Sequence, residues 1–390
     1  MKRDLPDGLV PAQATMTAPI VLFDPVGSVA TATDMLERAV AAGAQSLLML
    51  AADGNGWSAA QIDPVLRAQP VPLFGGVFPQ VVHGGINVER GTVVCGLPQA
   101  VEVLYVDRLS DPEADYGETL SRSGDRLAGH PTRLVFVDGL ARRVGALLDA
   151  LFERFGAHET WIGGGAGSLS FLQRPCLFSN AGLVGDCAQL VGVPQHWQVG
   201  VEHGWDLFAG PFVVTAAQDN VIRALDYRPA FEVYREAVMH AGGPVVNADA
   251  FFDTAKGYPF GMEVLDRELL VRDPIITRGG ELVCVGEVPV NSVVHILRGE
   301  PAHLIGAAAR CARRVVTRGA PSFALLVDCI SRVLFLQDRF RQELAAVNQA
   351  LPAGAPLVGV LSLGEIANGG DQCLDFYNKT LVLAAAPAAR

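Results

Sequence analysis

The sequence has few charged residues, little positive charge and no long apolar run. Only 18% of its 390 residues are charged, and 30 Lys and Arg residues stand against 41 Asp and Glu residues, which gives a net charge of -11. This balance disfavours a phosphate-binding surface, so we predict no nucleic-acid partner. A membrane-spanning helix needs about 18 or more apolar residues in a row. Because no such run is present, we expect no membrane insertion.

Cysteine motifs and secretion signals are also missing. The seven cysteines form no C-x-x-C pair, which disfavours a disulfide framework and a zinc ribbon. The eight histidines form no H-E-x-x-H motif, so no metal site is predicted, and the cofactor is left unknown. Residues 1–18 carry Asp4, Pro6 and Asp7 where a signal peptide needs an apolar segment. We therefore predict a flexible extension over 1–18 and a cytoplasmic protein.

A strand-helix-strand unit followed by a returning strand occurs three times. Its helices have one apolar stripe, as Leu147, Leu148 and Leu151 show, so each covers a sheet. Crossover units of this kind, extended by a hairpin strand, predict an α/β protein of several lobes with mixed sheets. The three units are predicted from the strands that begin at Gln45, Val71 and Thr92, at Thr132, Glu159 and Cys187, and at Ser322, Pro356 and Thr380.

Residues 248–299 have a different pattern, with short alternating strands that predict an antiparallel meander. Asp273-Pro274 and Gly279-Gly280 are expected to be its turns. The periodicity breaks in the preceding segment. We therefore predict an α/β region over 19–240, a linker over 241–257 and a second α/β region over 258–390.

Glycines follow one another at Gly163, Gly164 and Gly165, but the last glycine of a dinucleotide fingerprint is replaced by Ser168. A small ligand held by main-chain N–H groups and simple tight packing both explain such a run. The segment around Ser362 lacks the first glycine of a nucleophile elbow, which disfavours serine hydrolase chemistry.

Arg332 and Glu365 each follow a predicted strand. We expect them at the strand ends of one sheet, in one cleft with Gly163–Gly165, where they recognise a charged small molecule. Arg332 is equally explained by pairing with Asp328. Cys329 is a candidate nucleophile for an enzyme acting on an anionic substrate, with Arg332 as the anion-binding group. Its position at the end of an apolar strand favours the simpler interpretation of a buried thiol.

His203 lies among apolar and aromatic residues. It is either a structural histidine or a contact to a ligand or haem. If haem binds, His203 is the first candidate for the axial ligand and His240 the second.

Six segments in order resemble the FIST family, whose members have FIST N and FIST C regions. They are WIGGGAGSLSF from Trp161, VGVEHGWDLFAGPFVVT from Val199, NVIRALDYRPAFEVYREAV from Asn220, LLVDCISR ending at Arg332, LGEI from Leu363 and FYNKTLVL from Phe376. Ser331 stands where the family often has Gly, and the first lobe is divergent. The resemblance implies a signal-input protein that binds small ligands such as amino acids. It also implies an alternative, since some members are haem proteins that sense nitric oxide and regulate a histidine kinase.

We therefore predict an intracellular FIST-type sensor of a small ligand, with FIST N-like and FIST C-like regions at 19–240 and 258–390. No kinase or DNA-binding segment is recognised, so its output is expected to pass through a histidine kinase or another signalling protein. The alternatives are the haem-binding nitric oxide sensor and the Cys329-dependent enzyme. Ligand identity and oligomeric state are left open.

Overall fold

The computed structural model describes residues 16, 18–264, 269–316, 321–368 and 373–387. Of the predicted extension over 1–18, all but Met16 and Ala18 lies outside these residues. The model confirms the α/β class, with mixed sheets along most of the chain and an antiparallel sheet in the meander region.

Three units form the body of the molecule, as the repeats predict. Each has an outer strand, a helix, two parallel strands joined by one or two further helices, and a returning antiparallel strand. The first unit contains β1 (Ile20–Asp24), α1 (Val29–Ala41), β2 (Ser46–Ala52), α2 (Ala59–Arg67), β3 (Leu73–Phe78) and β6 (Thr92–Leu97). The second contains β7 (Glu102–Asp107), α3 (Tyr116–Ser123), β8 (Thr132–Asp138), α4 (Val144–Phe155), β9 (Thr160–Ala166) and β12 (Cys187–Val193). The third contains β13 (Gln198–Glu202), α7 (Pro301–Val315), β21 (Pro321–Cys329), α8 (Ile330–Leu336), α9 (Phe340–Ala350), β22 (Leu357–Ser362) and β25 (Leu381–Pro387).

Each unit also gives a hairpin to the sheet of another unit, so that the three sheets are interlocked in a cycle. The first unit extends the third sheet, the second extends the first sheet, and the third extends the second sheet. This exchange pairs segments that are far apart in the sequence, so local sequence patterns do not predict it. The exchanged hairpins are β4 (Gln80–His83) with β5 (Ile86–Val88), β10 (Leu177–Ser179) with β11 (Gly182–Val184), and β23 (Glu365–Ala367) with β24 (Asp375–Tyr377).

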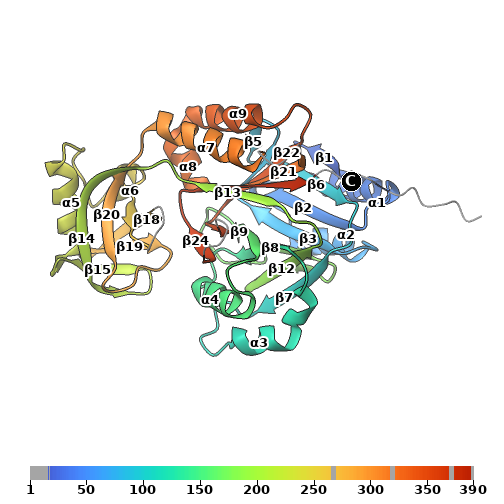
Figure 1. The fold of residues 1–390 in the computed structure, drawn as a ribbon, viewed down its shortest axis with the longest axis horizontal. Coiled ribbons are helices and arrows are strands. Elements are labelled where there is room, and N and C mark those ends of the chain that lie inside the picture. Colours follow the sequence, from blue (N-terminus) through green and yellow to red (C-terminus); the bar gives the residue numbers. More distant parts are fainter. Residues whose placement is uncertain (1–15, 17, 265–268, 317–320, 369–372, 388–390) are drawn as a thin grey trace, which may run out of the picture.

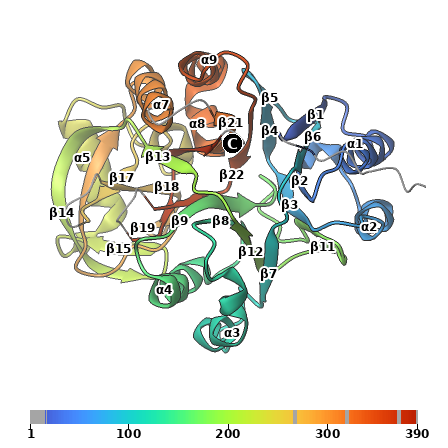
Figure 2. The ribbon, with the colours of Figure 1, turned by 45° about the vertical axis from the view of Figure 1, so that its right-hand side comes forward.

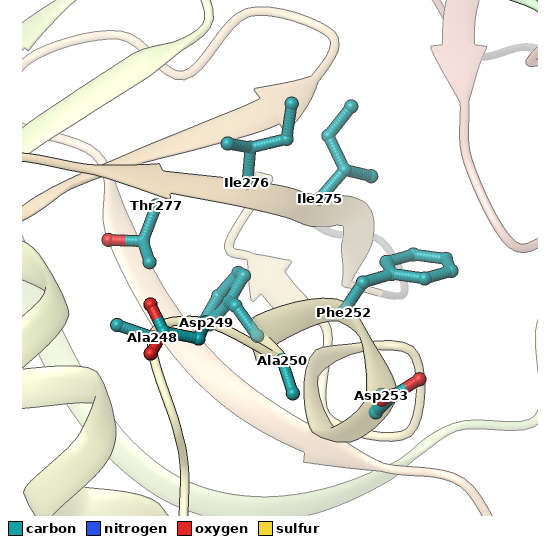
Figure 3. Close-up of a pocket in the computed structure, with 9 residues that line it drawn as sticks. Ala248, Asp249, Ala250, Phe252, Asp253, Ile275, Ile276 and Thr277 are labelled. Atoms are coloured by element: carbon teal, nitrogen blue, oxygen red, sulfur yellow. The ribbon is translucent and has the colours of Figure 1, made fainter.

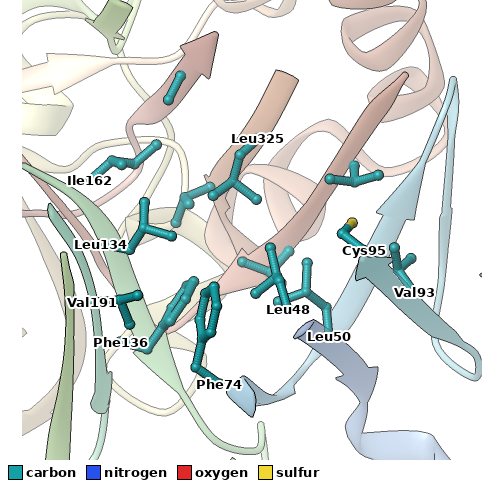
Figure 4. Packing of buried hydrophobic residues seen from close by; sticks show 14 of the residues in the cluster. Leu48, Leu50, Phe74, Val93, Cys95, Leu134, Phe136, Ile162, Val191 and Leu325 are labelled. Carbon is teal, nitrogen blue, oxygen red and sulfur yellow. The ribbon is translucent and has the colours of Figure 1, made fainter. Parts of the chain in front are cut away.

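The three sheets face a common centre and their helices lie outside (Figure 2). Inward residues such as Leu50, Phe136 and Leu325 come from different sheets and form one apolar core (Figure 4). The outward faces bury a separate apolar layer under each set of helices. Sheets covered on both sides explain why the strands are continuously apolar in the sequence.

A ring of strands is inserted between β13 and α7 of the third unit and extends from one side of the body (Figure 1). Its six strands close on themselves because β14 pairs with both β15 and β20. The ring consists of β14 (Asp206–Gln218), β15 (Val221–Leu225), β17 (Phe260–Met262), β18 (Leu270–Arg278), β19 (Glu281–Val285) and β20 (Val293–Arg298), with β16 (Arg228–Pro229) at its margin. Helices α5 (Ala230–His240) and α6 (Phe251–Ala255) pack against it, and short 3-10 turns occur at η1 (Asp53–Asn55), η2 (Gly124–Leu127) and η3 (Gln337–Arg339).

The ring confirms the predicted meander with one correction. Gly279-Gly280 is the turn between β18 and β19, but Asp273-Pro274 lies inside β18. The register shifts between Pro274 and Ile276. A bulge thus accommodates the proline that we predicted at a turn, because a strand irregularity removes the need for its missing N–H.

Candidate functional site

The close approach of paired strands allows the three units to be compared residue by residue. A glycine in the second parallel strand faces a carbonyl of the first strand in every unit: Gly75 faces Met49, Gly163 faces Val135, and Gly359 faces Leu326. A Cβ on these glycines would lie 2.0, 1.7 and 2.3 Å from the respective carbonyl oxygens. Since the same steric requirement recurs, these pairs define equivalent positions.

Equivalent positions at the carboxyl ends of these strands differ in chemistry. In the first unit they are Ala52 and Phe78, in the second Asp138 and Ala166, and in the third Cys329 and Ser362. On the exchanged strands, Val81, Leu177 and Glu365 are equivalent, because they pair with Val360, Gly76 and Gly164. The third unit alone has two polar side chains at these positions, Ser362 and Glu365, and both are buried beside the thiol of Cys329.

Arg332 is the centre of a buried network behind these strand ends. Its Nε and Nη2 donate to the two carboxylate oxygens of Glu343 at 3.0 and 2.6 Å. Its remaining hydrogens go to the carbonyl oxygens of His203 (2.6 Å), Lys379 (3.1 Å) and Leu304 (3.3 Å). A guanidinium has five N–H donors. All five are therefore used within the chain, and the carboxylate of Asp328 lies 3.3 Å from Nε.

Charges in this network modify one another. Burial raises the pKa of Asp328 well above its usual range, and the carboxylate of Glu343 raises it further. Burial lowers the pKa of Arg332, but Glu343 and Asp328 outweigh this and raise it above its ordinary value. Arg332 is thus always charged, whereas Asp328 tends to hold a proton.

Glu365 is buried against the ends of β21 and β22. Ser362 Oγ donates to its Oε1 at 2.7 Å, and the Thr380 N–H points to its Oε2 at 3.3 Å. Burial raises the pKa of Glu365 to about 8, although hydrogen bonds from Ser362, Thr380 and Cys329 oppose the rise. The Cys329 thiol is 4% exposed, and its pKa is raised by burial and by Glu365. At neutral pH this contact joins a carboxylic acid and a thiol.

Asp273 and Lys379 connect the ring to the body. Asp273 Oδ2, on β18, accepts a hydrogen bond from Ser331 Oγ at 2.9 Å and lies 3.1 Å from Lys379 Nζ. The same ammonium donates to the Lys256 carbonyl at 2.9 Å and lies 5.2 Å from the centre of the Trp205 ring. The backbone of Lys379 has φ +51°, a left-handed conformation that residues other than glycine rarely adopt. Such strain persists only where the surroundings hold the residue, which is common at functional sites.

We call these side chains the junction cluster. It unites the carboxyl end of the third unit with the ring. Within it, Asp273 Oδ1, Asp328 Oδ2 and Asn378 Oδ1 are buried without a hydrogen-bond partner among the described residues. Its members are Asp273, Asp328, Cys329, Ser331, Arg332, Glu343, Ser362, Glu365, Asn378 and Lys379.

The structure brings the predicted residues Gly163–Gly165, Arg332 and Glu365 together, but not within one sheet. Glu365 pairs with Gly164 in the sheet of the second unit, whereas Arg332 follows β21 of the third. The expectation of one shared sheet was therefore wrong, because β23 is exchanged between units. The N–H of Gly165 is donated to the Gly364 carbonyl at 2.8 Å, and a Cβ on Gly164 would lie 2.8 Å from Val327. This glycine run permits close strand packing.

The predicted histidines lie apart. His203 adjoins the junction cluster, where its Nδ1 accepts the Trp205 N–H at 2.9 Å, and burial together with Arg332 lowers its pKa to about 4. His240 is exposed at the end of α5 on the ring. Sequence reasoning missed Asp273 and Lys379. The signal available was a charged pair, Arg272-Asp273, within an apolar run.

An open pocket of about 370 Å³ lies on the ring (Figure 3). Ile275, Ile276 and Thr277 of β18 form one wall, and the segment with Asp249 and Asp253 forms the other. No unpaired buried group points into it among the described residues. We therefore place the candidate site at the junction cluster.

Models of two family domains match nearly the whole chain. The FIST N domain matches residues 23–228, and the FIST C domain matches residues 230–368. The chain belongs to the FIST family. A comparison with curated proteins finds no significant match.

FIST domains are sensory domains of signal transduction that bind small ligands. The FIST N and FIST C matches meet inside the ring, between β16 and α5, and β13 of the FIST N match completes the third sheet. The two FIST regions are thus interwoven in space. Within the residues placed by the structure, no helix is long and apolar enough to cross a membrane.

Proposed function

We propose that this FIST protein is a sensor that binds its small ligand at the junction cluster. One observation carries the proposal: the third unit has the buried polar groups Ser362 and Glu365 at positions where the first unit has Phe78 and Val81. Ser362 and Glu365 bond to each other, but within the same cluster Asp273 Oδ1 and Asn378 Oδ1 lack a donor among the described residues. A buried polar group without its hydrogen bonds destabilises a fold by about 1–3 kcal/mol. The first unit builds the same sheet without this cost, so the polar groups of the third unit serve a purpose other than folding.

The position of the cluster suggests how binding is transmitted. Asp273 and Arg272 belong to the ring, whereas Lys379 and Ser331 belong to the body. A ligand that enters between them changes the contacts by which the ring sits on the body, and a ligand shifts an equilibrium by its differential affinity for the two states. The output passes to a separate partner in the cytoplasm, a histidine kinase or another signalling protein.

Arg332 takes part by holding the site in place. Its five donors fix Glu343 and the carbonyls of His203, Leu304 and Lys379, which leaves none for an anion. Gly163–Gly165 act likewise, by allowing Glu365 to approach. The direct contacts to a ligand come from Glu365 and the ring–body residues.

Thermal unfolding of ligand-free protein with a panel of amino acids, amines and related metabolites tests the proposal. A bound ligand adds RT ln(1 + [L]/Kd) to stability, about 2.7 kcal/mol at one hundred times Kd. We expect a compound that raises the Tm of the wild type and of Asp53→Asn, but not of Glu365→Gln. A shift that survives Glu365→Gln unchanged places the ligand elsewhere.

Haem binding at His203 is the alternative from the sequence. The lowered pKa keeps its imidazole neutral, as an axial ligand must be. The neighbouring backbone is closely packed, however, since a Cβ on Gly204 would lie 2.7 Å from Ala307 of α7. These surroundings do not fit a flat macrocycle on that side. Haem titration of the wild type and His203→Ala decides the matter, because axial coordination requires a Soret band that the substitution alters.

The Cys329-dependent enzyme is the remaining alternative. A nucleophilic cysteine needs a thiolate and access, whereas burial and Glu365 hold the pKa of Cys329 well above its usual range. We expect iodoacetamide to label Cys329 no faster than the protein unfolds. Faster labelling of the native protein would revive a catalytic role.

A further inference from the structure

The junction cluster has more buried carboxyl groups than cations. Four carboxyl groups and two cations are fully buried in it: Asp273, Asp328, Glu343, Glu365, Arg332 and Lys379. Arg272, next in sequence to Asp273, is directed to charges outside the cluster, chiefly Asp375 and Glu287. Unpaired charges are very unfavourable in a protein interior. Asp328 and Glu365 have raised pKa values and hold protons, so Lys379 and Arg332 match the charges of Asp273 and Glu343, and neither cation is left over for a ligand.

The buried polar atoms of the cluster that lack a hydrogen-bond partner are oxygens. Among the described residues, Asp273 Oδ1 and Asn378 Oδ1 are acceptors without a donor, and Asp328 Oδ2 also lacks a partner but belongs to a carboxyl group that holds a proton. The donors of Arg332 are all taken, and Lys379 Nζ is shared between Asp273 and the Lys256 carbonyl. In the part of the chain that the structure describes, a ligand here meets acceptors without donors, and both cations of the cluster already have partners.

The cluster already holds one ammonium group. Lys379 Nζ is surrounded by the Asp273 carboxylate, the Lys256 carbonyl and the Trp205 ring. A carboxylate, a carbonyl oxygen and an aromatic face are the groups that recognise alkylammonium ions. Within the described chain, the Oδ1 of the same Asp273 carboxylate is unpaired and can accept a hydrogen bond from a second ammonium group.

We propose that the ligand is a cationic amine whose ammonium group binds Asp273 Oδ1, and that a free carboxylate on the ligand is disfavoured. This rests on the proposed function, since it specifies the ligand of the same site. An α-amino acid brings a carboxylate that the cluster has no spare cation to pair with. Amines are therefore selected over the amino acids from which they differ by that one group.

Matched pairs isolate this difference. Putrescine, cadaverine and phenethylamine are compared with ornithine, lysine and phenylalanine by thermal shift and calorimetric titration of the full chain. We expect at least one amine to bind at least tenfold more tightly than its parent amino acid. Equal or tighter binding by the amino acids overturns the inference and leaves the sensor proposal standing, as does a shift given only by uncharged metabolites. No shift from any compound of the wider panel removes both.

Two substitutions place the amine. Asp273→Asn preserves the acceptor facing Ser331 but removes the charge, so the amine is expected to lose at least tenfold in affinity. Asp53→Asn is the control, since Asp53 forms a polar contact with Ser168 in the body, away from the ring. If Asp273→Asn does not fold, Lys379→Met is used. This change leaves the Asp273 carboxylate without its cation, which is expected to raise the preference for amine over amino acid. An unchanged preference in Lys379→Met, or unchanged affinity in Asp273→Asn, contradicts the assignment.

Discussion

The first and third units of the body build the same sheet and end it in opposite ways. Strands β2 and β3 end in Ala52 and Phe78 within the apolar core, whereas β21 and β22 end in Cys329 and Ser362 beside Glu365. The same sheet topology forms with apolar residues at the strand ends in the first unit and with Cys329 and Ser362 in the third. Polar groups at the third end are thus a departure from what the fold requires, and such departures are expected at functional sites.

The largest effect is expected for Arg332→Met. This change leaves Glu343 and Asp328 buried without their cation, and breaking a buried ion pair costs about 3–5 kcal/mol. Urea unfolding gives the free energy, with Arg174→Met as the control, because the Arg174–Asp53 pair is partly exposed and contributes about 0–1 kcal/mol. If both variants lost the same free energy of unfolding, the network around Arg332 would stabilise the fold no more than the exposed Arg174–Asp53 pair does.

Gly163→Ala tests whether the shared glycine is needed for the unit itself. Its Cβ would lie 1.7 Å from the Val135 carbonyl oxygen, so the strands must separate, and we expect a loss of about 1–3 kcal/mol. The equivalent change Gly359→Ala, with 2.3 Å to the Leu326 oxygen, is expected to cost less. Chemical denaturation of both variants provides the comparison. The reverse order would contradict the equivalence of the units.

Glu365 should make stability depend on pH. Its pKa is raised to about 8 from 4.5, so its stabilising contribution is complete below pH 4.5 and is lost as the pH rises through 8. His203 has the opposite effect, since its lowered pKa of about 4 makes its contribution complete above pH 6.5 and lost as the pH falls through 4. Between pH 6.5 and 8, the free energy of unfolding should fall by about 1.5 kcal/mol on account of Glu365. Glu365→Gln should remove this decrease in urea titrations, and a slope retained in full would assign it to other groups.

The smallest change in stability is expected when the polar residues at the strand ends of the third unit are replaced by those of the second unit. The double variant Ser362→Ala with Glu365→Leu introduces the residues of Ala166 and Leu177 at equivalent positions. Replacing buried polar groups by apolar ones of similar size is often neutral or stabilising. We expect a Tm equal to or above that of the wild type, within about 1 kcal/mol of stability, together with loss of ligand binding. A strongly destabilised variant would show that the polar groups are needed for folding.

Much of the fold was predictable because its helices and strands follow local patterns of apolar residues. The helix that contains Leu147 and Leu151 and the returning strands at Thr92 and Cys187 have the predicted places, since apolar stripes and alternation act within a few residues. The short helix α8 was not predicted, because its seven residues are too few to show a period. Arg332, Cys329 and Glu365 were found as candidates because polar groups at strand ends stand out.

The sequence by itself determined the three repeated units, the mixed sheets and the membership of the FIST family. Tertiary structure decided how the units interlock, since β4, β10 and β23 each pair with residues more than a hundred positions away in the sequence. It also decided that Asp273 meets Lys379, and that all five donors of Arg332 are bonded to acceptors within the chain. Local patterns specify which face of an element is buried, whereas the partner it is buried against depends on the packing of the whole chain.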